Sequence, residues 1–368
     1  MPSTAFERDM VTMRVLSPGN DALLDAREFN KTLGKIILRS TFDSCMLDFA
    51  ERKGATVLEQ TTVRDVVLKD DGVVVTCRDG AGKEETRAGD VLFLATGTRG
   101  LNLHRKVGLD TPPVVESVIC EFESSARHIE ETLSSGAYHY YLNKNITGIG
   151  PFWISCRQET FNAGIIDRKV SKERFVNAMA RDPRVKDLFA GAKKKTWPGM
   201  DSPFMTALIP AAPLKVPYAD RVLALGDSAG LTHQFYYEGV WEARVSARLA
   251  VETIARLLDE GRAPTARNLA GYKALLARHL VNKWLRSGRK NSYMFWQAKR
   301  DETLWFHFCD TMARSKAFRR LIVECYEADY AASDVDYDFK AGELIFQHLP
   351  ALKKISLAPL FLKVGSMK

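Results

Sequence analysis

The sequence predicts a mixed α/β (α+β) protein: an α/β domain interrupted by an inserted β-sheet domain and followed by a helical C-terminal region. Two short apolar runs, DVLFLAT at 90–96 and RVLALGD at 221–227, each lead into glycine-containing turns. Runs of this kind are typical of buried strands in a parallel sheet. Between them lie alternating, strand-like segments, and beyond Pro264 the pattern is mostly helical. Together these features indicate two separated halves of one domain around an insertion.

These features divide the 368 residues into four ranges. We assign 1–110 and 211–275 to the interrupted α/β domain. The inserted sheet domain then covers 111–210, and the C-terminal helical region covers 276–368.

Composition excludes several classes of protein. An apolar fraction of 46% with 27% charged residues is ordinary for a globular chain. No apolar run reaches the length of a membrane-spanning helix, and the first residues lack the apolar core of a signal peptide. We therefore expect a cytoplasmic protein, or one peripheral to the inner face of the membrane.

The cysteines and the net charge bear on metal sites, disulfides and binding partners. The six cysteines form no CxxC pair, so we expect neither a metal site nor a disulfide framework. A net charge of +8 can attract an anionic cofactor, a phosphorylated substrate or an acidic membrane, or can simply keep the surface soluble. No nucleic-acid-binding signature accompanies the charge, so we expect no nucleic-acid partner.

The first half of the chain is expected to be mostly sheet. Residues 1–35 are predicted to be irregular, with a turn at Pro18-Gly19. Apolar spacing predicts an amphipathic helix over 41–53, capped by Gly54. Strands are predicted at 55–63, 64–70 and 72–79, joined by hairpin turns at 70–72 and 79–80.

The second half alternates strands and helices. Strands are predicted at 114–123, 137–143, 150–156 and 160–167, with one helix near 171–181. A long helix with small residues on one side is predicted to follow Gly239 and to end near Asp259.

The most informative segment runs from Arg221 to Ala250. A buried strand ends at Gly226-Asp227; the small residues Ser228, Ala229 and Gly230 follow, and a loop leads to Glu238-Gly239 and the long helix. The Asp227 carboxylate can accept hydrogen bonds from a polyol, glycines let a ring or a pyrophosphate approach the backbone, and the free N–H groups of a helix start favour negative charge.

This order of strand, GDSAG, loop, Glu-Gly and helix resembles the second flavin motif of the aromatic-hydroxylase and geranylgeranyl-reductase superfamily of FAD-dependent oxidoreductases. The resemblance implies an incomplete Rossmann-like FAD-binding domain. It implies that Asp227 binds the ribityl chain of FAD and that the stretch around Tyr237, Glu238 and Gly239 lies along the flavin ring. The cofactor-binding candidates in this segment are Gly226, Asp227, Ala229, Gly230, Glu238 and Gly239.

Two earlier segments follow in the order of the same family. ILRSTFD resembles the family's Arg-containing helix, which implies that Arg39 lies near the ADP half of FAD, although a lone arginine at a helix start is often only a surface cation. DVLFLATGTRG resembles the strand that enters an Ala-Thr/Asp-Gly turn, with Gly97 near the pyrophosphate. Thr96 and Gly100 stand where the family often has Asp and Ser.

Aromatic residues supply candidates for a substrate pocket. Phe152 and Trp153 fall where the reductase branch has an aromatic signature, in a different order. Phe235 and Tyr236 replace small residues and a proline before Glu238-Gly239. Each of them can line an apolar pocket or belong to a sheet core.

The GxGxxG fingerprint that opens such a protein does not occur in this sequence. We interpret this as a start codon assigned too late, or else as a genuine fragment that binds FAD poorly.

The sequence thus predicts an FAD-dependent oxidoreductase that acts on an apolar small molecule, with NAD(P)H as electron donor. The reaction is either reduction of a carbon–carbon double bond or flavin-dependent monooxygenation. Candidate catalytic residues are His233, as a proton donor or else a solvated loop histidine, and Tyr237. The alternative is a non-catalytic, cofactor-poor remnant or partner-binding protein of the same fold.

A basic, aromatic C-terminal region indicates a further contact with an anionic membrane, or else a core with a solvated face. The aromatic residues concerned are Trp284, Phe295, Trp296, Trp305 and Phe306. The oligomeric state is not predicted.

Overall fold

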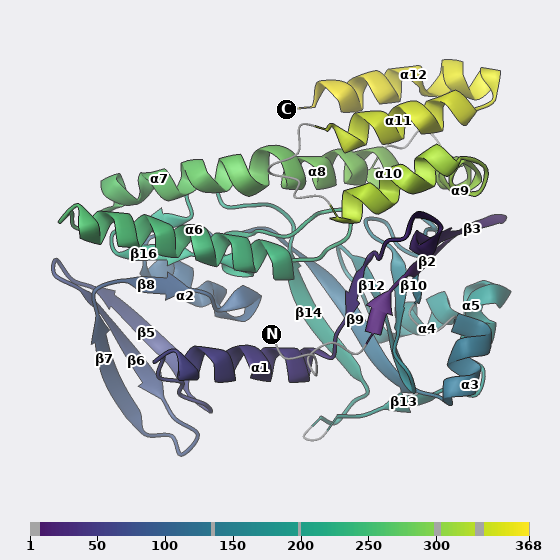
Figure 1. The fold of residues 1–368 in the computed structure, drawn as a ribbon. Coiled ribbons are helices and arrows are strands. Elements are labelled where there is room, and N and C mark those ends of the chain that lie inside the picture. The colour runs from purple at the N-terminus through teal and green to yellow at the C-terminus, as the bar shows by residue number, and fades with distance from the viewer. Residues whose placement is uncertain (1–7, 134–136, 198–199, 298–302, 328–334, 368) are drawn as a thin grey trace. The chain divides into compact units, whose positions relative to one another are not determined.

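The structure, a computed structural model, describes residues 8–133, 137–197, 200–297, 303–327 and 335–367 (Figure 1). The chain groups into two units. The first contains residues 1–54, 116–207 and 290–368, and the second contains residues 55–115 and 208–289. Residues 1–54 group with the sheet unit, whereas the sequence analysis placed them in the α/β domain. Each unit is described by itself below.

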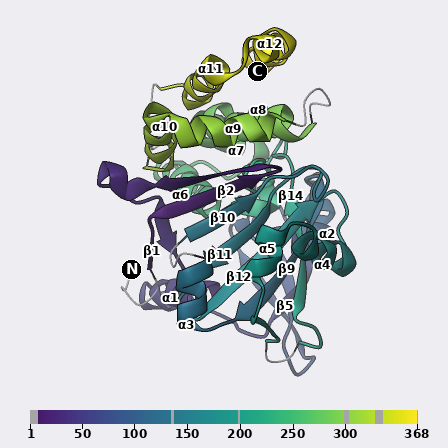
Figure 2. The same ribbon diagram turned by 90° about the vertical axis from the view of Figure 1, so that its right-hand side faces the viewer.

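The first unit is built on one large mixed sheet. Its strand order is β13-β9-β12-β11-β10-β2-β3, with β14 also paired to β9 (Figure 2). Within the order from β13 to β3, neighbouring strands are antiparallel except for β10 and β2, which are parallel. The strands are β2 (Thr12–Ser17), β3 (Asn20–Asp25), β9 (Val114–Glu123), β10 (Ala137–Tyr141), β11 (Phe152–Cys156), β12 (Thr160–Asp167), β13 (Lys193–Lys195) and β14 (Phe204–Pro210). A separate pair joins β1 (Arg8–Met10) to β4 (Gly34–Ile36).

The prediction of irregular structure before residue 35 is wrong. Strands β2 and β3 form a hairpin that turns at Pro18-Gly19, where Gly19 has φ +76°. The residues of β2 are buried at successive positions rather than at alternating ones. A strand covered on both faces shows no period-2 pattern, so periodicity could not reveal it.

One face of the sheet carries the core of this unit. Phe122, Phe161 and Phe152 lie there with Phe175 of helix α4 (Lys172–Arg181). Helix α4 begins at Ser171, whose hydroxyl accepts a hydrogen bond from Arg174 N–H at 3.1 Å, as an N-cap residue does. The short helical segments on this face are α3 (Ala126–His128), η4 (Ile129–Leu133) and α5 (Pro183–Leu188).

Trp153 and Phe152 point to opposite faces of the sheet, because adjacent residues of a strand alternate. Phe152 is fully buried in the aromatic core. Trp153 lies on the other face, over its cross-strand partner Gly164. A Cβ at Gly164 would come within 2.2 Å of Trp153 Cζ2, so the ring occupies the space that a side chain would need.

We predict that Gly164→Ala lowers the free energy of unfolding by about 1–3 kcal/mol, because the new methyl group must displace the indole ring. Gly342→Ala is a matched control in helix α11, since its Cβ would sit at an ordinary 3.6 Å from Phe361. The control should be neutral or stabilising by up to about 1 kcal/mol. Urea denaturation of both variants would measure the two changes in the free energy of unfolding. Equal changes would show that the Trp153 ring does not occupy the space beside Gly164.

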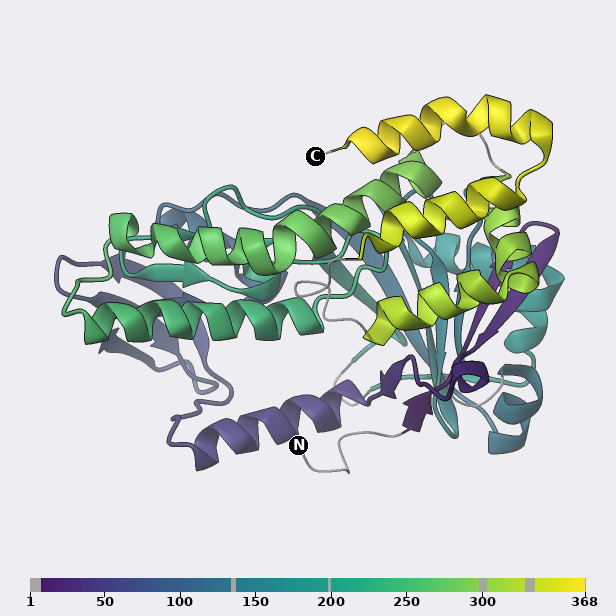
Figure 3. The ribbon, with the colours of Figure 1, turned by 45° about the horizontal axis from the view of Figure 1, so that its top comes forward.

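The remaining helices of this unit include α9, which packs on β3 and β2. Helices α11 and α12 run side by side near the C-terminus (Figures 1 and 3). The helical segments are η2 (Ala26–Phe29), α1 (Arg39–Arg52), η7 (Tyr293–Gln297), α9 (Leu304–Arg314), α10 (Lys316–Glu327), α11 (Tyr337–His348) and α12 (Ala351–Ser366). None of the helices in the described ranges is long and apolar enough to cross a membrane.

The helix predicted over 41–53 is α1, and Gly54 follows it with φ +95° as the expected C-terminal glycine. Its predicted apolar face is not a buried face. Phe42 is buried, whereas Phe49 of the predicted face is 53% exposed.

The C-terminal aromatic residues are mainly core. Phe295, Trp296 and Trp305 are each less than 5% exposed, and Phe295 stacks on Trp305 with ring centroids 4.2 Å apart. Phe306 is 38% exposed. The sequence left open whether this region faces a membrane or forms a core, and for Phe295, Trp296 and Trp305 the core is observed.

The second unit contains two small sheets. Strands β5 (Thr62–Leu68), β6 (Val73–Arg78) and β7 (Glu84–Gly89) form an antiparallel meander, with turns at the predicted positions. The segment 55–63, predicted as a strand, joins it only from Thr62. The other sheet has the order β15 (Tyr218–Ala219), β16 (Val222–Ala224), β8 (Leu92–Leu94).

Helices cover this second sheet. Helix α6 (Val240–Asp259) has the predicted bounds and lies beside α7 (Ala266–Leu276), as Figures 1 and 3 show. Tyr272 of α7 is buried and donates a hydrogen bond to the Ala224 carbonyl of β16 at 3.0 Å. The other helical segments are α2 (Leu101–Lys106), η6 (Ala277–Leu285) and α8 (Arg286–Ser292), which continues into the first unit.

Strand β8 stands at the edge of its sheet. Leu92 N–H donates to Arg221 O and Leu94 O accepts from Leu225 N–H, so the polar backbone groups of Leu92 and Leu94 face β16. Those of Phe93, between them, face the opposite direction. No strand of the described ranges pairs with β8 on that side, and Phe93 is 39% exposed.

Candidate functional site

Two turns lie side by side in the second unit, each at the carboxyl end of a strand. Strands β8 and β16 are parallel neighbours, so the turn η3 (Gly97–Gly100) and the turn η5 (Gly226–Ala229) leave the same edge of the sheet. Ser228 Oγ lies 3.4 Å from Thr96 Oγ1 and donates to the Gly97 carbonyl at 3.3 Å. Ligands of α/β sheets bind outside this edge.

Glycines shape both turns. Gly97, Gly226 and Gly230 all have positive φ, of 60°, 51° and 75°. A Cβ at Gly230 would come within 2.2 Å of the Ala212 carbonyl oxygen, so the backbone there passes too close for any side chain. A Cβ at Gly97 would meet nothing within 4 Å. The space beside Gly97 is therefore available to a bound group.

Asp227 and Gly239 face each other across the loop that follows η5. Thr232 Oγ1 donates to Asp227 Oδ1 at 3.3 Å. A Cβ at Gly239 would lie 3.0 Å from that same Oδ1 and 3.4 Å from Thr232 Oγ1. Gly239 is also the N-cap of α6 and places no side chain on the first N–H groups of the helix. This leaves a cradle that offers a carboxylate acceptor beside backbone donors.

The loop of residues 231–239 is held by its own hydrogen bonds. His233 N–H donates to Glu238 O at 3.0 Å, and Tyr237 N–H donates to His233 O at 2.7 Å. Tyr237 has φ +57°, in the left-handed region that a tyrosine rarely adopts. A conformation of this kind persists only where the surroundings enforce it.

His233 is not a solvated loop residue. It is 1% exposed, and its ring contacts the rings of Trp284 and Tyr236 at centroid distances of 4.1 Å and 5.0 Å. Nδ1 accepts a hydrogen bond from Tyr236 N–H at 3.4 Å. Burial lowers the pKa of His233 to about 3. The ring is therefore neutral near pH 7.

Several residues of the site were not predicted from the sequence. Trp284 of η6 donates from Nε1 to Glu242 Oε1 at 2.6 Å, and Glu242 is 2% exposed. Buried His104 of α2 donates from Nε2 to the Ser228 carbonyl at 2.7 Å. The burial of Glu242 could have been inferred from the sequence, because Glu242 lies on the same side of α6 as Ser246, Leu249 and Thr253, which are buried. A glutamate on a buried stripe calls for a specific partner.

The other predicted residues are distributed over both units. Ala229 is buried in the turn η5, Glu238 is exposed at the end of the loop, and Phe235 packs edge-on against Tyr236. Arg39 belongs to the first unit, where it forms an exposed ion pair with Asp43 at 3.0 Å. Phe152 and Trp153 also belong to the first unit. Because Phe152 lies inside the core, only Trp153 of this pair stays a candidate for a pocket on the opposite face.

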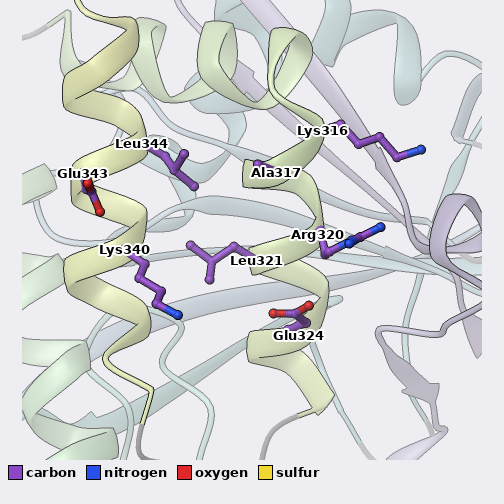
Figure 4. Close-up of a pocket in the computed structure, with 8 residues that line it drawn as sticks. All are labelled: Lys316, Ala317, Arg320, Leu321, Glu324, Lys340, Glu343 and Leu344. Atoms are coloured by element: carbon purple, nitrogen blue, oxygen red, sulfur yellow. The ribbon is translucent and has the colours of Figure 1, made fainter.

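A groove of about 480 Å³ between α10 and α11 holds none of these candidates. Figure 4 shows Leu321 and Leu344 pointing toward each other across it, while Lys316 and Arg320 point away. Acidic residues Glu324 and Glu343 offset the cations on its rim. We assign no function to this groove.

The residues of the second unit fit part of an FAD molecule. The cradle between Asp227 and Gly239 offers an acceptor for hydroxyl groups, and no atom lies within 4 Å of the position that a Cβ at Gly97 would take. Both lie at the carboxyl edge of parallel strands, where dinucleotides bind.

Comparison with known proteins gives matches in sequence. No protein-family model matches the chain. Protein FixC of Bradyrhizobium diazoefficiens is 27% identical over 275 residues, which cover 68% of this chain and 60% of FixC. A digeranylgeranylglycerophospholipid reductase of Methanoculleus marisnigri is 24% identical over 261 residues, or 69% of this chain and 62% of the reductase. The chain thus spans about three-fifths of the length of these relatives.

Solved structures match over nearly the whole chain. A geranylgeranyl bacteriochlorophyll reductase-like protein of Thermoplasma acidophilum superimposes with a TM-score of 0.74, at 14% identity, over 98% of this chain and 85% of that protein. The chain has a geranylgeranyl-reductase-like fold. The flavin-dependent brominase Bmp2 matches with a TM-score of 0.69, at 16% identity, over 94% of this chain and 83% of the brominase. The predicted fold class and the resemblance to this superfamily of FAD-dependent oxidoreductases are confirmed.

The buried carboxyl of Glu242 makes the stability of this geranylgeranyl-reductase-like fold dependent on pH. Burial raises its pKa from the ordinary 4.5 to about 8, opposed by the hydrogen bond from Trp284, while the nearby charges of Glu238 and Asp227 raise it further. Between these two pH values the folded chain keeps a proton that the unfolded chain has released. The stability that this proton confers is present at low pH and is lost as pH rises toward 8.

We predict that Glu242→Gln removes this loss. The free energy of unfolding of the variant relative to wild type should rise between pH 5 and pH 8, by at most about 1.4 kcal/mol per pH unit. Urea denaturation at a series of pH values measures it. Parallel profiles for the two proteins would show that Glu242 does not titrate as described.

Proposed function

We propose that this chain carries the activity of an FAD-dependent oxidoreductase that acts on an apolar small molecule. The observation that carries the proposal is the juxtaposition of the Gly97 turn with the Gly226–Gly230 turn at the carboxyl edge of β8 and β16. Fold similarity to a reductase-like protein and to a flavin-dependent brominase supports it. The sequence similarity to a digeranylgeranylglycerophospholipid reductase supports an apolar, isoprenoid-like substrate.

The residues of the second unit would have distinct roles toward FAD. Asp227 would accept hydrogen bonds from the ribityl hydroxyls, held in place by Thr232. The turns at Gly97 and Gly230 would bring backbone N–H groups close to the pyrophosphate. The stretch Tyr237–Gly239 would lie along the flavin ring, so that its backbone faces the ring where α6 begins.

When bound, FAD supplies the hydride or electron transfer. NAD(P)H is the proposed electron donor. The reaction is reduction of a carbon–carbon double bond or monooxygenation, and we favour reduction because one relative is named a reductase of a digeranylgeranylglycerophospholipid. Tyr237 remains the proposed catalytic residue, as its backbone places it in the loop assigned to the ring.

The visible absorption spectrum of the purified protein tests the cofactor. It should be recorded for this chain and for a form extended by the residues encoded upstream. Flavin bands in either form support the proposal. Absence of bands from both, also after incubation with FAD, would favour the cofactor-poor, partner-binding alternative.

We predict that Asp227→Ala weakens FAD binding by about 10- to 100-fold, because one charge-assisted hydrogen bond contributes about 1.5–3 kcal/mol. Asp259→Ala is the matched control, since it removes an equal charge from an exposed position at the end of α6. Quenching of flavin fluorescence gives the affinities. Equal affinities for the two variants would rule out Asp227 as a ligand.

A further inference from the structure

Four side chains, Glu242, Trp284, His233 and Tyr236, pack together at the loop of residues 231–239; we call this group the Trp284 stack. The three rings contact one another pairwise, and the Tyr236 and Trp284 centroids lie 6.4 Å apart. Trp284 joins Glu242 through its Nε1–H at 2.6 Å. The Trp284 and His233 rings have centroids 4.1 Å apart, and those of His233 and Tyr236 lie 5.0 Å apart at an interplanar angle of 23°. The edge of the stack is covered by Trp241, perpendicular to Trp284.

His233 links this stack to the backbone of the loop. Its amide donates to Glu238 O, its carbonyl accepts from Tyr237 N–H, and its Nδ1 accepts from Tyr236 N–H. One residue thus fixes three successive positions of the loop. The ring takes part through Nδ1, so a shift of the His233 ring would disturb the contact with the Tyr236 amide.

Gly288 of α8 leaves the space that the His233 ring occupies. A Cβ at Gly288 would lie 2.9 Å from His233 Nε2, and equally close to His233 Cδ2 and Gln234 N. A residue with a side chain would therefore push against the loop at two adjacent residues. The glycine sits inside a helix, where alanine is intrinsically preferred, so its presence calls for a packing reason.

We propose that the Trp284 stack positions the flavin-facing loop, with Glu242, Trp284 and His233 as positioning residues and Gly288 as the residue whose missing side chain admits His233. This inference rests on the proposed function, in which Tyr237–Gly239 face the flavin. The stack acts through the loop backbone and contacts no reacting atom. Glu242 anchors it to the first turn of α6, so the loop and the helix start move as one body.

Gly288→Ala tests the stack from a position outside the predicted binding residues. Gly271→Ala is the matched control, because Gly271 is also helical and its Cβ would meet only the flexible end of Arg256, at 3.1 Å. Hydrogen–deuterium exchange at the Tyr236 and Tyr237 amides reports the loop directly, without cofactor. Exchange there should rise about tenfold in Gly288→Ala, and FAD affinity should fall about tenfold; Gly271→Ala should change neither.

A conservative replacement at Glu242 distinguishes loss of the loop's position from a general loss of folding. Glu242→Gln keeps an oxygen that can accept from Trp284 Nε1–H, so at pH 7 it should retain wild-type amide protection and the wild-type spectrum of bound flavin. Glu242→Ala removes the acceptor and should lose both the amide protection of the loop and the wild-type spectrum of bound flavin. Equal behaviour of the two variants would overturn the role of this hydrogen bond.

The two readouts distinguish the possible failures. If the wild-type protein and its extended form bind no FAD, the proposed function fails, while amide exchange still decides whether the stack holds the loop. If FAD binds and Gly288→Ala leaves loop exchange, affinity and flavin spectrum unchanged, the positioning role is overturned and the proposed function stands.

Discussion

The candidate site depends on one contact between distant parts of the chain, the parallel pairing of β8 with β16. Leu92–Leu94 and Val222–Ala224 are separated by more than a hundred residues, yet they form adjacent strands. Because parallel strands end at the same edge, this single ladder brings the Gly97 turn beside the Gly226–Gly230 turn. The Thr96, Ser228 and His104 contacts then fix the two turns to each other. Without the ladder, the Gly97 turn would not lie beside the turn that carries Asp227.

A second constraint operates on the loop before α6. Its backbone adopts a left-handed conformation at Tyr237, which local preference opposes, so buried side chains must impose it. Those side chains are polar or aromatic rather than aliphatic. A buried carboxyl and a buried neutral imidazole cost solvation free energy, and both are retained here with one defined hydrogen bond each. This combination indicates a loop whose exact position matters more than the stability that an apolar core would give.

Much of this arrangement was predictable from the sequence, and the exceptions have physical causes. The strand–turn–helix order at 221–259 has a strong local pattern, and α6 begins and ends at the expected residues. The β2–β3 hairpin was missed because β2 is covered on both faces and shows no alternation. Trp284 and Glu242 were missed because their contact joins residues 42 positions apart on two helices, a relation that no local period encodes. The burial of His233 could not be predicted because it depends on the space left by Gly288, which lies 55 residues further along the chain.

The outer edge of β8 has a consequence for what can pair with this sheet. Because the backbone N–H and C=O of Phe93 face away from β16, another polypeptide segment can add there as a new strand. Charged residues or proline usually protect such an edge, and Leu-Phe-Leu offers neither. A segment added there would lie next to the strand that leads into the Gly97 turn.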